Sequence, residues 1–143
     1  MRSLCLTFLG LILLFGCGKD KAVTPVKSNP DGRWTYTTPD NSISVEFDLK
    51  STASGSVEIL NPVIVVLGTT GVAAAQMTDI NVPSIGTIRI NANDSDLVHP
   101  FSITFTNCTL SSDFTKILVV EAEYTYPWGF LKKLSNINII RKE

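Results

Sequence analysis

From Trp34 onward, apolar and polar residues alternate with a period of two, which is typical of β-strands with one buried face. The clearest run places Ile43, Val45, Phe47 and Leu49 between polar residues. Seven further apolar runs fall at 57–59, 63–67, 80–82, 88–90, 101–105, 118–126 and 137–139, and residues that favour turns separate many of them. The pattern predicts an all-β domain of eight or nine short antiparallel strands, arranged as an up-and-down barrel or, alternatively, a β-sandwich.

Two details of this pattern carry specific expectations. The segment Val72 to Met77 is rich in alanine and favours a helix, although six residues are too few for a helix that is stable alone. In the run at 118–126 the alternation predicts one inward face, formed by Leu118, Val120, Ala122, Tyr124 and Tyr126.

The N-terminal residues follow a different pattern. Arg2 precedes an almost unbroken apolar stretch from Leu4 to Phe15, which ends at Gly16 and Cys17. A basic start, a short apolar segment and a small residue at the cleavage site predict a secretory signal at 1–16. The stretch is shorter than the roughly 20 residues of a transmembrane helix. Ordinary secretion without lipid and a retained membrane anchor are the alternatives.

A cysteine directly after the small residue resembles the lipobox of bacterial lipoproteins. The resemblance implies cleavage before Cys17 and a diacylglycerol on its thiol. Two or three acyl chains hold a protein stably on a membrane. Residues 17–31, with several charges and two prolines, are expected to be a flexible tether, and 32–143 the barrel domain. Gly18 favours the outer membrane of a bacterial cell envelope, with the membrane face left open.

Composition limits the possible functions. The chain has 143 residues, with 12 Lys and Arg against 13 Asp and Glu, so it lacks the basic excess expected of a nucleic-acid partner. After removal of the signal and acylation of Cys17, Cys108 is the last cysteine, which excludes an intramolecular disulfide. With a single histidine, His99, the sequence offers no thiol–base pair and no zinc site, so we predict no enzyme, metal or cofactor.

A second resemblance concerns the start of the predicted barrel. Gly32-Arg33-Trp34 is similar to the Gly-x-Trp signature of lipocalins and of small Bacteroidetes-type lipoproteins with lipocalin-like domains. The resemblance implies that Trp34 closes one end of the barrel. It also implies that Arg141, in the last strand, packs across the indole ring, an arrangement that is favourable by about 0.5–2 kcal/mol.

The sequence leads to two functional hypotheses. The first is a non-catalytic carrier that holds a small hydrophobic ligand in its barrel, lined by Ile43, Val45, Phe47, Phe101, Ile103, Phe105, Tyr124 and Tyr126. The same large side chains also suit a barrel that is filled by its own core. The second is a structural or adhesive module whose surface binds an envelope protein or glycan. Aromatic residues around Trp128, followed by Lys132 and Lys133, are candidates for gripping a ligand or partner.

Overall fold

The computed structural model describes residues 28–92, 101–125, 129 and 131–143, without the side chain of Val72. The sequence predictions for Cys17, His99, Tyr126 and Trp128 therefore lie outside the described residues. No helix among the described residues is long and apolar enough to cross a bilayer.

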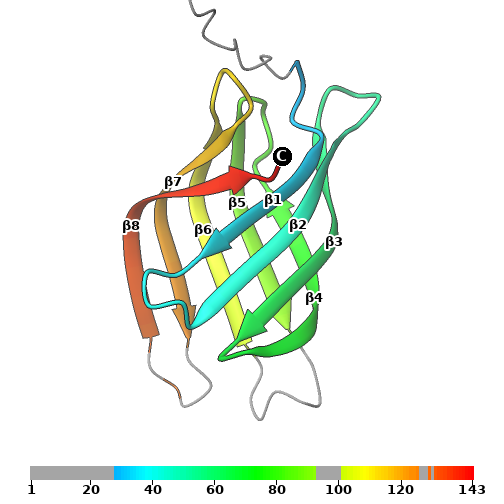
Figure 1. Ribbon diagram of the computed structural model, residues 1–143. Helices are drawn as coiled ribbons and strands as arrows, with labels where there is room; N and C mark the ends of the chain where they lie inside the picture. The colour runs from blue at the N-terminus through cyan, green and yellow to red at the C-terminus, as the bar shows by residue number, and fades with distance from the viewer. Residues whose placement is uncertain (1–27, 93–100, 126–128, 130) are drawn as a thin grey trace, which may run out of the picture.

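The chain forms a closed antiparallel barrel, in which each strand pairs with the next and the last pairs with the first (Figure 1). The predicted up-and-down barrel is confirmed over the sandwich. Its eight strands are β1 (Gly32–Thr37), β2 (Ile43–Ser51), β3 (Val57–Val66), β4 (Thr69–Thr78), β5 (Ser84–Ala92), β6 (Phe101–Leu110), β7 (Lys116–Thr125) and β8 (Leu131–Arg141).

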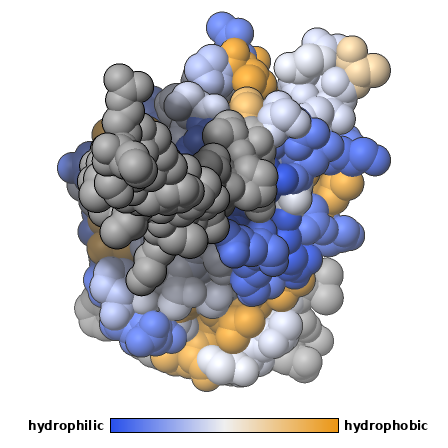
Figure 2. All heavy atoms as spheres, turned by 45° about the horizontal axis from the view of Figure 1, so that its top comes forward, coloured by the Kyte–Doolittle hydropathy of each residue, from blue (hydrophilic) through white to orange (hydrophobic). Residues whose placement is uncertain are grey.

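The up-and-down order gives the barrel two distinct ends. We call the end where β1 begins and β8 ends the upper end, which lies at the top of Figure 1. The lower end holds the β1–β2 and β3–β4 turns (Figure 1). Figure 2 brings the upper end forward and shows hydrophilic and apolar patches side by side on its surface.

The core occupies the inside of the barrel, because alternate residues of each strand point inward. Its largest fully buried side chains are Trp34, Tyr124, Phe47, Phe101 and Phe105. The rings of Tyr36 and Phe105 meet edge to face, with their centroids 5.5 Å apart. This geometry is favoured by the ring quadrupoles.

Asparagines in left-handed backbone conformations shift the alternation within three strands. Asn61 in β3, Asn107 in β6 and Asn136 in β8 have φ angles of 48°, 55° and 54°. Asparagine tolerates this conformation better than most residues, and an extra residue in a strand moves the following side chains to the opposite face. In β6, Phe105 is buried, Asn107 is exposed and Cys108 is buried again.

The same slip occurs in β7, where the predicted inward face is half wrong. Ala122 and Tyr124 are buried as predicted, but Leu118 and Val120 are exposed, and Ile117 and Val119 are buried in their place. Val119 pairs with Ile137 and Glu121 pairs with Ser135, so Val120 lies opposite the left-handed Asn136.

Two other local predictions are also wrong. The segment Val72 to Met77 belongs to β4 rather than to a helix, because pairing with β5 supplies hydrogen bonds that six helical residues cannot match. Ala73, Ala75 and Met77 pack against the core from this strand. The run at 80–82 is a turn with a single bridge between Asn81 and Ser84.

Candidate functional site

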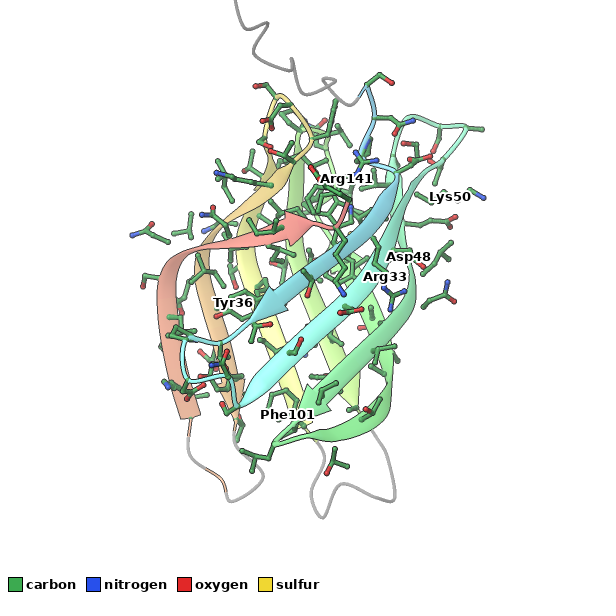
Figure 3. All side chains as sticks on the ribbon, in the orientation of Figure 1. Arg33, Tyr36, Asp48, Lys50, Phe101 and Arg141 are labelled. Atoms are coloured by element: carbon green, nitrogen blue, oxygen red, sulfur yellow. The ribbon has the colours of Figure 1, made fainter. Side chains whose placement is uncertain are left out.

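The upper end of the barrel is closed by a cluster around Trp34, which is fully buried. Its indole Nε1 donates a 3.0 Å hydrogen bond to the carbonyl of Pro30. Arg141 pairs with Trp34 across the β1–β8 ladder, and its guanidinium donates to the carbonyls of Asn29, Asp31 and Phe114 (Figure 3). The guanidinium therefore ties the entering chain to the end of β8, and its stacking on the indole stays a prediction.

Gly32 is required by this arrangement. A Cβ atom at Gly32 would lie 2.9 Å from Nε of Arg141, and the residue has a φ of +143°, which side chains rarely adopt. The structure thus gives the Gly32-Arg33-Trp34 segment a packing reason for both its glycine and its tryptophan.

The last residues of the predicted tether take part in the same closure. Pro30 is buried, and the Asp31 carboxylate accepts hydrogen bonds from the backbone N–H (2.7 Å) and hydroxyl (2.6 Å) of Ser51. These donors hold the pKa of Asp31 below its usual range. The chain consequently enters the barrel at the upper end, with its last tether residues fixed.

The side chains predicted to line a ligand cavity point into the barrel and are buried. Those that the structure describes, Ile43, Val45, Phe47, Phe101, Ile103, Phe105 and Tyr124, are each 0–1 % exposed. A side chain without accessible surface leaves no space for a water-sized probe beside it, so around these residues the interior is filled. Whether they contact a ligand stays a prediction.

The lower part of the seam between β1 and β8 is built differently. The ladder between these strands contains two residue pairs, Trp34 with Arg141 and Thr35 with Ile140, whereas β7 and β8 share nine. Below Thr35 the described residues of β1 and β8 have no ladder pairs with each other. In this lower part, side-chain contacts connect β8 with the β1–β2 turn.

Four residues, which we call the lower-rim cluster, gather at this unpaired part of the seam: Tyr36, Asp40, Tyr124 and Lys132. Lys132 is the cross-strand partner of Tyr124, so both side chains start on the same, inward face of the barrel. Lys132 Nζ lies 6.0 Å from the centroid of the Tyr124 ring and 3.0 Å from Oδ2 of Asp40 in the β1–β2 turn. An ammonium group thus stands at the edge of an otherwise apolar interior.

The Tyr36 hydroxyl is the unusual group of the cluster. Tyr36 is 6 % exposed, and its buried hydroxyl has no hydrogen-bond partner among the residues that the structure describes. Burial, followed by the nearby negative charge of Asp40, raises its pKa, so the hydroxyl keeps its proton. Hydrogen bonds to Asp40 and Tyr124 raise the pKa of Lys132, which is charged at neutral pH. A buried polar group without a partner is costly and marks a place where a ligand or water can bind.

The sequence identified this cluster only in part. It singled out Lys132 and Lys133 beside the aromatic turn, but it did not single out Tyr36 or Asp40. The structure separates the two lysines, because Lys133 points outward to Glu121 and Glu123 at 3.3 and 2.9 Å. The signal for Tyr36 was its place two residues after Trp34, on the same face of β1.

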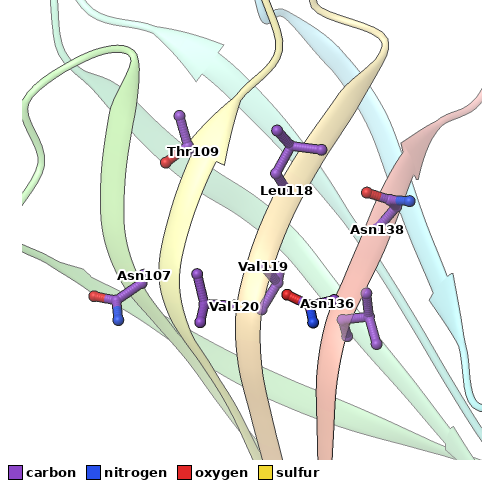
Figure 4. A pocket seen from close by; sticks show the side chains of 8 residues that line it. Asn107, Thr109, Leu118, Val119, Val120, Asn136 and Asn138 are labelled. Carbon is purple, nitrogen blue, oxygen red and sulfur yellow. The ribbon is translucent and has the colours of Figure 1, made fainter.

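The outer surface carries ion pairs and a shallow apolar depression. Glu46 and Asp48, on β2, pair with Arg33 on β1 at 3.0 and 3.5 Å. The depression, about 400 Å³ in volume, lies over β6, β7 and β8 (Figure 4). Its lining combines the exposed Leu118 and Val120 with polar Thr109, Asn107, Asn136 and Asn138.

The described residues offer no assembled metal or thiol chemistry. No group of three or more His, Cys, Asp or Glu residues in the described parts of the chain is arranged to hold a metal ion. Cys108 is buried in the core, and burial raises the pKa of its thiol to about 12. The thiol is therefore protonated at neutral pH and a poor nucleophile.

Comparisons with models of known protein families, with curated proteins and with solved structures gave no significant match.

Proposed function

We propose that this chain is a lipid-anchored protein of the outer membrane in the bacterial cell envelope, and that it binds a small, largely apolar molecule without catalysis. The signal-like residues 1–16 and Cys17 support the anchor. The closed barrel with an apolar interior supports a binding role, since such barrels hold ligands at their mouths.

One observation carries the location of the binding site. Among the described residues the Tyr36 hydroxyl is buried without a hydrogen-bond partner, its ring packs on Phe105, and it lies within electrostatic range of Lys132. Fully buried side chains fill the middle of the barrel, and the Trp34 cluster closes the upper end. These features favour a ligand at the lower rim. The described chain enters the barrel at the upper end, with Pro30 and Asp31, opposite the lower rim.

The proposal is tested by native mass spectrometry of the full chain, purified gently from its host in a neutral detergent. We expect the wild type to retain a small molecule. Phe101 lies at the lower end beside Tyr124, with ring centroids 6.4 Å apart (Figure 3). Phe101→Trp should therefore displace neighbouring side chains into the lower rim and remove the added mass.

Phe47→Trp is the matched control, because Phe47 is equally buried but pairs with Trp34 in the upper half of the barrel. Both variants overpack the core and should lose about 1–3 kcal/mol of stability, which thermal unfolding measures. A ligand-free wild type, or equal loss in both variants, would argue against a lower-rim site.

The depression over β6 to β8 favours a second candidate function, a surface module for an envelope protein or glycan. Leu118 and Val120 are about half exposed there, at 48 % and 53 %. Under this alternative the wild type carries no small molecule, and Val120→Glu abolishes co-purification of an envelope component.

A further inference from the structure

We infer that Lys132 and the Tyr36 hydroxyl form an anion-binding site, so that the ligand is an amphiphile with an acidic head group held at the lower rim. This inference rests on the proposed function and specifies the class of its ligand. Three features of the lower-rim cluster support it: hydrogen-bond donors that the protein does not use, an exposed and weak ion pair between Lys132 and Asp40, and apolar surroundings.

The cluster offers more donors than the protein uses. Tyr36 contributes an O–H group that is buried and has no acceptor. Lys132 contributes three N–H groups, two of which are engaged by Asp40 and Tyr124. A carboxylate, sulfonate or phosphate accepts several hydrogen bonds at once and carries the charge that complements the ammonium. A neutral hydroxyl matches the hydrogen bonds but not the charge, and a cationic head group is repelled.

Asp40 does not need Lys132 to stay satisfied. Its Oδ1 accepts hydrogen bonds from the hydroxyls of Thr38 (2.6 Å) and Ser42 (2.7 Å) and from the Ser42 backbone N–H (3.2 Å). The side chains of Asp40 and Lys132 are each 39 % exposed, and ion pairs of this kind contribute little to stability. Lys132 is therefore free to exchange Asp40 for the acid group of a ligand.

The surroundings favour an amphiphile over a free inorganic anion. Phe105 packs against the Tyr36 ring and Phe101 lies beside Tyr124. These rings are 0–6 % exposed, so a hydrocarbon tail reaches them only where they move apart, and burial of the tail then adds affinity with each methylene.

The test uses three probes with the same ten-carbon tail: decanoate, decan-1-ol and decyltrimethylammonium. Each is added to the full chain in a neutral detergent, and native mass spectrometry measures the bound fraction. Inorganic phosphate is added separately as a tail-free anion. We expect decanoate to bind about tenfold or more tightly than decan-1-ol, as for a hydrogen bond to a charged group, and phosphate to bind more weakly.

The variants separate anion binding from a purely structural ion pair. Lys132→Met should abolish the preference for decanoate, and Tyr36→Phe should weaken decanoate binding about threefold. Asp40→Asn removes the carboxylate that competes for Lys132 and should strengthen decanoate binding. Lys133→Met is the matched control, because Lys133 points outward to Glu121 and Glu123 and should bind as the wild type does.

Each contrary result has a distinct meaning. Equal weakening by Lys132→Met and Asp40→Asn means that Lys132 acts only through its ion pair, which overturns the inference. Equal binding of decan-1-ol and decanoate, or a preference for the cationic probe, also overturns it and leaves the proposed apolar binding intact. If the wild type binds none of the tailed probes, both the inference and the proposed function fail.

Discussion

The seam between β1 and β8 is held in two different ways along its length. In the upper part, backbone pairs and the Arg141 guanidinium join the two strands around the buried Trp34. In the lower part, the described strands share no ladder pairs, and the exposed ion pair of Lys132 with Asp40 spans the gap. Stability is thus concentrated at the end where the chain enters, while the other end keeps the buried Tyr36 hydroxyl, which has no hydrogen-bond partner among the described residues and which binding can use.

The largest effect is expected at the upper end, from Trp34→Ala. The change empties a fully buried site and removes the hydrogen bond to Pro30, so the free energy of unfolding should fall by about 3–5 kcal/mol. Urea denaturation measures this loss. Leu118→Ala, on the exposed outer face of β7, is the control and should change stability by no more than about 0.5 kcal/mol. A loss below about 1 kcal/mol for Trp34→Ala would remove the contrast between the two ends.

Arg141→Met tests the side-chain part of the upper closure. The carbonyls of Asn29, Asp31 and Phe114 lose their charged donor, which should lower the free energy of unfolding by about 1.5–3 kcal/mol. Arg141→Lys should recover only part of this loss, because an ammonium lacks the planar fork of a guanidinium. Full recovery by lysine would mean that charge alone, and not the fork, holds the upper end.

Tyr36→Phe should have a smaller effect of opposite sign in ligand-stripped protein. The variant removes a buried hydroxyl that has no partner and keeps the edge-to-face contact with Phe105. Loss of this polar group should raise the free energy of unfolding by about 1 kcal/mol. Thermal unfolding of matched, stripped samples gives the comparison. Destabilisation by the variant would show that the hydroxyl is satisfied in solution.

Acid should loosen the upper end through Asp31. The pKa of this carboxyl is lowered by the Ser51 donors, so its contribution to stability is present above its ordinary value of 3.8 and is lost as the pH falls below it. Between pH 5 and pH 2, the free energy of unfolding should therefore fall less steeply with decreasing pH in Asp31→Asn than in the wild type. Parallel curves would show that the Asp31–Ser51 contact does not contribute.

Alternation in the sequence predicted the barrel and most of its strands, but not β4 or the lower-rim cluster. Alternation of period two is a local signal, and it correctly placed residues such as Ile43 and Phe47 inside a barrel. Gly32, Trp34 and Arg141 were singled out through the resemblance of Gly32-Arg33-Trp34 to the lipocalin signature, not through alternation. Asp40 and Lys132 are 92 positions apart, and only closure of the barrel brings them together.

Local pattern failed where the backbone leaves regular alternation. Alternation predicted that Leu118 and Val120 face inward, but both are exposed. Asn107 and Asn136 in the neighbouring strands adopt left-handed conformations, and the sequence gives no clear signal of this. Their exposure creates the depression on the outer face, a candidate surface that alternation alone assigns to the core. Bulges of this kind depend on pairing across strands, which a single strand's composition does not encode.

The smallest effect is expected from the ion pair in the lower part of the seam. Lys132→Met, Asp40→Asn and the double variant form a cycle that isolates the coupling between the two side chains. Because both groups are exposed and Asp40 keeps the donors of its own turn, the three denaturation midpoints should stay close to that of the wild type. A coupling as large as the loss in Arg141→Met would mean that the lower part is held as firmly as the upper part. In that case Lys132 would not be available for exchange with a ligand, and the difference between the two ends of the barrel would have no consequence for binding.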